Sequence, residues 1–218
     1  MARLHHTIAD AAQCLRRGGI LIFPTETFYA LGCLASNAAA VDRIYRLKRR
    51  GATQPLPLLA ADRKQAAQAA RLESAPQDLL NLFWPGSLTV LLPAHPSLPP
   101  SLVNSKGKTA VRISPHRAAT EMARLAGGPL TASSANLHGR RPACRFRDID
   151  GELIHELDRH SAEAGLFEGD VPPAGGLPST LVEPLASAEQ GRICLCLVRP
   201  GAVSAEDLER AGFCVHSA

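Results

Sequence analysis

Two polar segments follow apolar runs and contain side chains suited to binding phosphate. The first is Lys48-Arg49-Arg50, at the end of a segment with helical periodicity. An arginine holds a phosphate through a bidentate fork and a lysine acts as a mobile point charge, so Lys48 and Arg50 together could hold a triphosphate. A solvated helix end explains the same cations, because positive charge is favourable at a helix C-terminus. The hydroxyls of Thr25 and Thr27, directly after another apolar run, favour the phosphate site.

The second polar segment contains Ser134 and Asn136, at the end of the apolar run 130–133. Short polar side chains often bond the backbone of their own turn, so local turn chemistry is one interpretation. The other is a binding pocket, because ligands of open α/β sheets bind where strands end. The hydroxyls of Thr131, Ser133 and Ser134 in series favour a pocket lined by hydroxyl groups.

Arg112 lies in an otherwise apolar segment that has the pattern of a strand. A buried charge has to be paired, because an uncompensated one is strongly destabilising. Arg112 therefore either forms a structural salt bridge or binds the carboxylate of a ligand.

No residue stands out as a covalent nucleophile or a general base. The histidines match neither metal-ligand nor Ser/His/Asp spacing, so no metal site is predicted.

The elements that must position these residues alternate along the chain. The apolar run 20–23 is typical of a strand buried on both faces, and Asn37 can cap a helix that buries Val41, Ile44 and Tyr45. Other expected N-caps are Thr7, Asp62 and Ser204. We expect helices at 8–17, 38–48, 63–72, 76–83, 116–125, 145–159 and 205–211. Strands are expected at 20–23, 55–61, 87–93, 109–114, 130–133, 181–182, 193–198 and 213–215, with irregular segments at 95–108 and 165–178.

Interleaved helices and strands predict an α/β fold with a twisted, open, mixed parallel and antiparallel sheet flanked by helices. The 218 residues are 45% hydrophobic, which is enough for a single domain spanning 1–218. No apolar run is long enough to span a membrane and residues 1–6 lack a secretion signal, so we expect a cytoplasmic location without membrane contact.

Cysteine spacing and charge add two further expectations. The six cysteines include no CxxC pair and no accompanying histidines at zinc spacing, so reduced thiols are expected. The net charge is +4, and the cations lie near the polar segments. This favours a nucleotide or RNA ligand, although scattered surface cations would give the same total.

Six ordered blocks along most of the chain carry a family resemblance. The opening block is PTETFYALG with KRR and QPLPLL after it, followed by WPGSLTVLL, KTAVRIS, TASSANLHG, PSTLVE and VRPGAV. Together they resemble the YrdC-like family of threonylcarbamoyl-AMP synthases. The resemblance implies the YrdC-like fold and a nucleotidyltransferase that forms threonylcarbamoyl-AMP and pyrophosphate from L-threonine, bicarbonate and ATP. It also implies use of the product by a downstream threonylcarbamoyl transferase that modifies adenosine in tRNA.

The resemblance also implies the site residues. The ATP-binding set is Lys48, Arg50, Gln54, Lys108, Ser134, Asn136 and Arg199, and the threonine-binding set is Thr27, Tyr29, Arg112 and Ser179. Magnesium is expected to arrive with ATP. Two positions depart from the family pattern. Ala30 replaces a glycine, and Leu59 stands where some members carry a histidine near the threonine.

Two other functions fit parts of the sequence. A non-catalytic module of the same fold could bind double-stranded RNA through shape and phosphate contacts. Nine aromatic residues are few for stacking single-stranded bases. A carbamoyl-transfer module like that of hydrogenase maturation is the other alternative, but the accessory zinc-finger and acylphosphatase segments are missing from the sequence. A direct contact with tRNA is compatible with the first alternative and with the enzyme.

Overall fold

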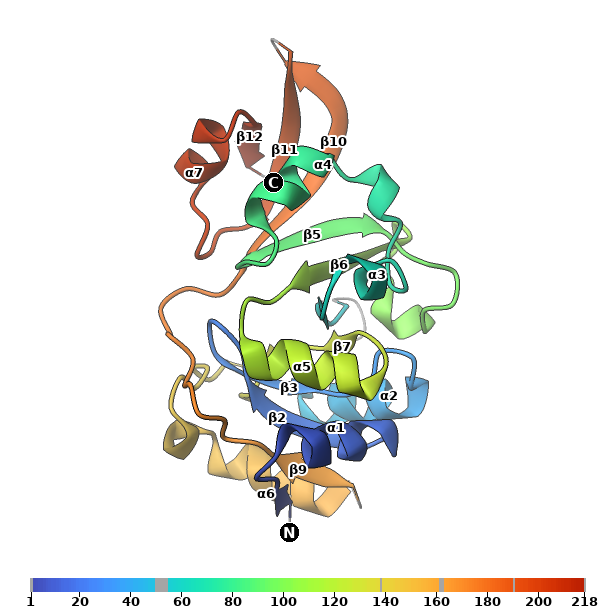
Figure 1. Ribbon diagram of the computed structural model, residues 1–218, viewed down its shortest axis with the longest axis vertical. Coiled ribbons are helices and arrows are strands. Elements are labelled where there is room, and N and C mark those ends of the chain that lie inside the picture. Colours follow the sequence, from blue (N-terminus) through green and yellow to red (C-terminus); the bar gives the residue numbers. More distant parts are fainter. Residues whose placement is uncertain (1, 50–54, 138, 161–162, 190, 218) are drawn as a thin grey trace.

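The computed structural model describes residues 2–49, 55–137, 139–160, 163–189 and 191–217. Figure 1 shows the elements in chain order from blue to red. The helices are α1 (Ile8–Arg16), α2 (Ala38–Leu47), α3 (Arg63–Ala66), α4 (Gln77–Phe83), α5 (Arg117–Ala126), α6 (Gly151–His160) and α7 (Ala205–Arg210). The strands are β1 (Arg3–Leu4), β2 (Ile20–Pro24), β3 (Tyr29–Gly32), β4 (Leu58–Ala60), β5 (Leu88–Pro93), β6 (Lys108–Ile113), β7 (Leu130–Thr131), β8 (Ser133–Ser134), β9 (Ala164–Leu166), β10 (Thr180–Glu189), β11 (Arg192–Arg199) and β12 (Cys214–Ser217).

These strands form two mixed sheets. One has the order β1-β9-β2-β3-β8 and the other the order β12-β11-β10-β5-β6-β4-β7. In the first, β2 pairs parallel with β9 and antiparallel with β3, and in the second, β5 pairs parallel with β10 and antiparallel with β6. The predicted mixed α/β class is therefore confirmed, with the strands divided between two sheets. Figure 1 shows the smaller sheet in the lower half and the larger one extending to the top.

The division passes through the segment 130–133, for which a single strand was predicted. Leu130 and Thr131 pair with β4 in the larger sheet, whereas Ser133 and Ser134 pair with β3 in the smaller one. The chain thus changes sheets at Ala132, and the polar residues after it lie where the two sheets meet. The short strands β1, β3 and β9 were not predicted.

Strand β2 is buried along its whole length, as its unalternating apolar run predicted. Its alternate residues face two different parts of the core. Ile22 belongs to the cluster that contains Ile44 of α2, and Phe23 belongs to the cluster that contains Leu15 of α1 and Met122 of α5. Helices therefore cover both faces of this strand, and the polar turn that follows it is held at a fixed place.

The four predicted N-caps are confirmed, whereas the helix predicted from residue 145 begins only at Gly151 as α6, after a 3-10 turn at Phe146–Asp148. Thr7, Asn37, Asp62 and Ser204 each accept a hydrogen bond from the backbone N–H three residues on, at 2.8–3.1 Å. Helix α3 ends at Ala66 rather than at 72, because the next backbone groups bond to the end of β5 and the residues after it: Arg71 N donates to Pro93 O and His95 N to Ala69 O. None of the helices among the described residues is long and apolar enough to cross a membrane.

Candidate functional site

A cavity of about 500 Å³ is lined by residues of both sheets. Its wall includes the turn between β2 and β3, strand β8 of the smaller sheet, and residues of β5, β6, β10 and β11 of the larger one. The predicted site residues in its lining are Thr27, Tyr29, Arg112, Ser134, Ser179 and Arg199. No histidine, cysteine or carboxylate lines it among the residues that the structure describes.

Arg112 borders this cavity while it is paired with Glu26 from the β2–β3 turn. The Arg112 Nε and Glu26 Oε1 atoms are 3.1 Å apart, and the side chains are 4% and 11% exposed. Their alignment is too poor for a hydrogen bond, so the contact is an ion pair. Ser114 Oγ donates to Glu26 Oε2 at 2.5 Å. The structural salt bridge is therefore present, and the guanidinium also borders the cavity, as a carboxylate-binding role requires.

Ser179 and Arg199 are bound to each other at the ends of β10 and β11. Arg199 Nη2 donates to Ser179 O at 2.6 Å and to Ser179 Oγ at 3.2 Å. The Ser179 hydroxyl is also hydrogen-bonded to Thr89 Oγ1 of β5, at 2.9 Å. At Gly201 an added Cβ would lie 2.2 Å from Pro178 O, so only glycine allows the chain after Arg199 to pack this closely. Three strands thereby fix one hydroxyl and one guanidinium in the cavity wall.

The turn between β2 and β3 supplies Thr25 and Thr27, and the first residue of β3 is Tyr29. The Thr25 hydroxyl donates to Phe28 O at 2.7 Å and lies 3.5 Å from the Thr27 hydroxyl. Tyr29 donates its hydroxyl proton to Glu168 O at 2.8 Å, and burial raises the pKa of Tyr29 to about 12. Tyr29 is therefore neutral at physiological pH, and its phenol is bonded to the segment after β9.

Lys48 is buried and connects α2 to β8. Its Nζ donates to Ser134 O at 2.5 Å. The residue is only 5% exposed, so the side chain does not lie at a solvated helix end. The two predicted polar segments are thus in direct contact. Asn136 uses its amide differently: Nδ2 donates to Leu137 O at 3.0 Å and to Arg140 O at 2.7 Å, which is the turn chemistry of the first interpretation.

The remaining positions named from the sequence, except Ala30, lie outside the cavity wall or outside the described residues. Lys108 Nζ is 2.5 Å from Glu183 Oε1 in an ion pair. Thr131 does not join the hydroxyls of the pocket, because its Oγ1 accepts from Cys33 N at 3.0 Å. Leu59 is fully buried in the core. Ala30 lines the cavity. Arg50 and Gln54 lie outside the described residues.

Sequence reasoning missed Glu26, Ser114 and Thr89, which hold Arg112 and Ser179 in place. Glu26 was visible as an acidic residue in a polar turn, but nothing in its neighbourhood pointed to Arg112. Thr89 lies in an apolar strand, where nothing in the sequence indicated a role at the site. In each case the two residues in contact are distant in the sequence.

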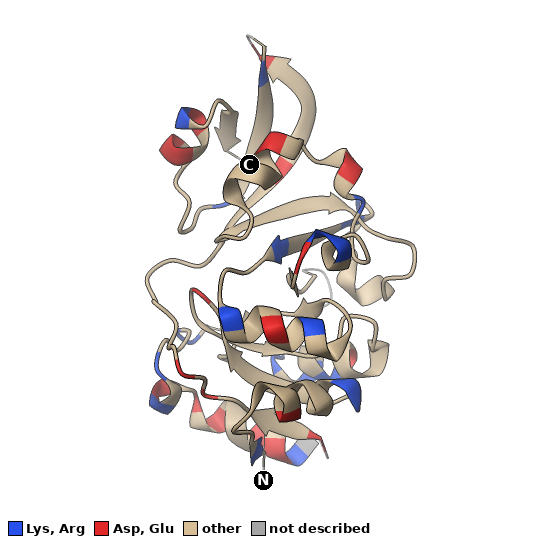
Figure 2. Ribbon diagram, viewed as in Figure 1, with Lys and Arg blue, Asp and Glu red and all other residues tan. Residues whose placement is uncertain are grey.

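The charge around the site is more balanced than the sequence indicated. Arg140, near one of the polar segments, pairs with Asp150 and Glu152. Figure 2 shows acidic and basic residues interspersed on α5, α6 and α7. The positive charge at the cavity comes from Arg112 and Arg199, of which the first is compensated by Glu26. The cavity can therefore bind anionic groups at defined points and lacks an obvious protein nucleophile among its described lining.

Residues 13–201 match the profile of the Sua5_yciO_yrdC family, which carries the description "Telomere recombination". The threonylcarbamoyl-AMP synthase of Stenotrophomonas maltophilia (strain K279a) is 37% identical over 190 residues, which are 86% of this chain and 96% of that protein. The threonylcarbamoyl-AMP synthase of Bacillus subtilis (strain 168) is 34% identical over 204 residues. These residues are 93% of this chain, which spans only 55% of that relative.

Solved structures agree with the fold. The crystal structure of P. abyssi Sua5 complexed with L-threonine superposes with a TM-score of 0.82 at 27% identity, covering 99% of this chain and 62% of that one. The crystal structure of E. coli YciO has a TM-score of 0.69 at 22% identity, covering 93% of this chain and 97% of that one, and is a likeness of fold alone.

Proposed function

Because this chain belongs to the Sua5/YciO/YrdC family, we propose that it is a threonylcarbamoyl-AMP synthase. It would form threonylcarbamoyl-AMP and pyrophosphate from L-threonine, bicarbonate and ATP, as a nucleotidyltransferase. The observation that carries the proposal is the cavity between the sheets, where two arginines and a series of hydroxyls meet. The names of the relatives support the same activity.

The threonine site would be built around Arg112. A guanidinium in a cavity wall forms charge-assisted hydrogen bonds with a carboxylate, and these are stronger than neutral ones. Glu26 contacts Arg112 at Nε, and the terminal Nη groups would bind the carboxylate of the ligand. Thr27 and Ser179 would contribute hydroxyls to the amino acid, and Tyr29 would form part of the wall.

The ATP site would extend from Arg199 to the contact between α2 and β8. Arg199 and Ser134 line the cavity, and Lys48 touches the backbone of Ser134. The further residues proposed for ATP are Arg50, Gln54, Lys108 and Asn136. Lys108 would have to leave Glu183 to reach a phosphate. Magnesium would enter as part of the Mg–ATP substrate, because no described carboxylate lines the cavity to hold it separately.

The proposed reaction needs positioning more than it needs a protein nucleophile. The amine of threonine and bicarbonate give a carbamate and water, and a carbamate oxygen then attacks the α-phosphorus of ATP as pyrophosphate leaves. Holding the two reactants in line supplies much of the rate, and cations at the leaving phosphates stabilise the developing charge. The arginines and Lys48 have the chemistry for these two tasks.

We further propose that residues 1–218 act as one domain, that the reaction takes place in the cytoplasm, and that a threonylcarbamoyl transferase consumes the product to modify tRNA. The second candidate, a double-stranded RNA-binding module, has less support. Cations near the motif blocks carry acidic partners, and Lys108, Arg112 and Arg140 are examples.

Pyrophosphate release by the purified chain tests the proposed function. Release should require ATP, L-threonine and bicarbonate together. Release that is unchanged without threonine would mean simple ATP hydrolysis and would overturn the proposal. Inactivity with all three substrates, together with tight binding of duplex RNA, would favour the RNA-binding module.

A further inference from the structure

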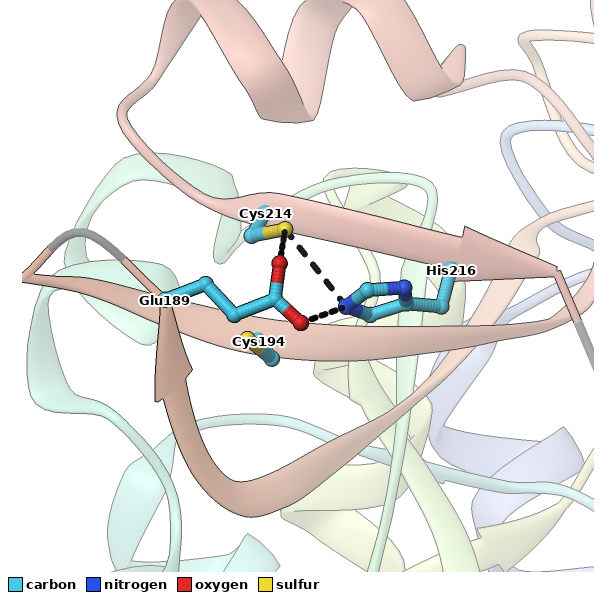
Figure 3. A group of neighbouring side chains, drawn as sticks. All are labelled: Glu189, Cys194, Cys214 and His216. Carbon is cyan, nitrogen blue, oxygen red and sulfur yellow. Dashed lines mark hydrogen bonds and ion pairs between the residues drawn. The ribbon is translucent and has the colours of Figure 1, made fainter.

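Four side chains of metal-binding types meet at the edge of the larger sheet, at the opposite end of the β10–β11 hairpin from the cavity. They are Glu189 at the end of β10, Cys194 on β11, and Cys214 and His216 on β12. Figure 3 shows Glu189 reaching across β11 toward Cys214 and His216, with Cys194 beneath. The proposed reaction uses none of these residues.

Strand register explains why residues so far apart in the sequence converge. Cys194 lies opposite Cys214 in the parallel pairing of β11 with β12, and Glu189 lies opposite Arg192 in the β10–β11 hairpin. Residues two apart on a strand share a face. Arg192 and Cys194 therefore point to one side of the sheet, as do Cys214 and His216. The backbone pairing places all four ligand groups on that side.

The distances fit one small ion with four ligands. Cys214 Sγ is 3.4 Å from Glu189 Oε2 and 3.5 Å from His216 Nε2, and His216 Nε2 is 3.4 Å from Glu189 Oε1. The candidate ligand atoms, including Cys194 Sγ, lie within 4.8 Å of one another. Tetrahedral zinc, with bonds of about 2.0–2.3 Å, places its ligand atoms about 3.3–3.8 Å apart. Small side-chain movements would therefore suffice to complete the coordination.

We propose that Glu189, Cys194, Cys214 and His216 bind one Zn²⁺ ion. Two thiolates, an imidazole and a carboxylate select a borderline-soft ion such as zinc over magnesium or calcium, which require oxygen ligands. Four protein ligands form a closed coordination shell, which is typical of structural rather than catalytic zinc. Cys194 is fully buried, whereas the Glu189 and His216 side chains are 57% and 41% exposed, so the ion can enter from solvent.

The ion would fasten the last strand to the hairpin. Within the larger sheet, β12 is an edge strand that pairs with β11. Zinc would add bonds from β12 to both β10 and β11, and the free energy of metal binding would add to the stability of the folded chain. This role is independent of the proposed enzymatic activity.

Metal content and cobalt spectroscopy of the full chain test the proposal. Protein purified under reducing conditions should hold one zinc ion per chain. After removal of the metal with a chelator, titration with Co²⁺ should give the visible bands of tetrahedral cobalt and a thiolate-to-cobalt charge-transfer band. Added Zn²⁺ should abolish both signals and raise the melting temperature.

Three variants locate the site. Cys214→Ser and His216→Asn each remove a proposed ligand. Substituting a residue that only supports a ligand already weakens metal binding about 10–100-fold, so each variant should lose at least that much affinity for Co²⁺. Cys196→Ser is the matched control, because Cys196 lies on the same strand and face as Cys194 but outside the cluster, and it should leave binding unchanged. Circular dichroism checks each fold, and the half-exposed His216 gives a second variant if Cys214→Ser fails to fold.

Three results would overturn the proposal. One is reduced protein that neither contains metal nor gives the tetrahedral cobalt spectrum. Another is a Cys196→Ser variant that loses as much affinity as Cys214→Ser, which would place the ion elsewhere. The third is a Cys194–Cys214 disulfide that persists under the reducing conditions and occupies both thiols.

Discussion

Replacing Arg112 with methionine, alone and together with Glu26→Gln, separates a ligand-binding role for Arg112 from a purely structural one. The ion pair is buried at the cavity wall, with 3.1 Å between Nε and Oε1. Arg112→Met alone leaves the Glu26 carboxylate with Ser114 but without a cation. Glu26→Gln keeps the shape of the side chain and removes its charge, so the double variant contains no uncompensated buried charge.

The expected loss of stability can be estimated from this geometry. Removing one partner of a buried ion pair costs about 3–5 kcal/mol. The Glu26 side chain is 11% exposed and would keep its hydrogen bond from Ser114, so we expect the lower end of this range, about 3 kcal/mol, for Arg112→Met. That corresponds to a fall in melting temperature of roughly 6–12 °C for a chain of this size. The double variant should recover most of this loss.

Threonine binding should follow a different order among the variants. A charge-assisted hydrogen bond contributes about 1.5–3 kcal/mol, so losing Arg112 should weaken threonine binding about 10–150-fold. Arg112→Met and the double variant should both show this loss, whereas Glu26→Gln should bind threonine within a few-fold of the wild type. ATP affinity should change little in all three.

Isothermal titration with threonine and ATP, alongside thermal unfolding, gives both quantities. A double variant that regains threonine affinity as it regains stability would refute the ligand-binding role, because Arg112 would then act only through the fold. Glu26→Gln that loses threonine binding as strongly as Arg112→Met would refute the separate roles given to the two residues.

Three further predictions concern the rest of the fold and site. Arg50→Lys keeps the charge but loses the bidentate fork, so turnover at saturating ATP and threonine should fall strongly, and near-full turnover would contradict a phosphate role. Burial raises the pKa of the Cys33 thiol from 9.0 to about 12, so between these two pH values the thiol ionises in the unfolded chain but stays protonated in the folded one. Stability should be full below pH 9 and fall toward pH 12, and Cys33→Val should flatten that fall in denaturant titrations. Gly32→Ala would place a Cβ 1.9 Å from Thr131 O, so its melting temperature should drop sharply, and an unchanged value would contradict this close packing.

The helix starts that have a side-chain N-cap were determined by the sequence alone. Each N-cap bond joins residues three apart, so the side chain and the N–H that it accepts from are visible in one short segment. Asn37 and Ser204 show this, since both accept from the predicted backbone groups. Strand β2 was equally predictable, because a short unbroken apolar run is typical of a strand buried on both faces.

Short strands were decided by tertiary structure. Strands β1, β3 and β9 were not predicted, because they have only two to four residues each, too few for a period of two to be recognised. Their strand character comes from hydrogen bonds to distant partners, such as those that pair β9 with β1 and β2. The change of sheet at Ala132 likewise depends on where β3 and β4 lie, and residues 130–134 alone do not encode it.

The candidate sites show the same distinction. The sequence identified Arg112 and Ser179 by residue type and by family resemblance, but their partners Glu26 and Thr89 became visible only in the folded chain. Cysteine spacing indicated no metal site, because the spacing rules apply to ligands on one turn or hairpin. Here the register of β11 on β12 brings Cys194 next to Cys214. Sequence spacing does not record register between strands, which is fixed only when the sheets pack.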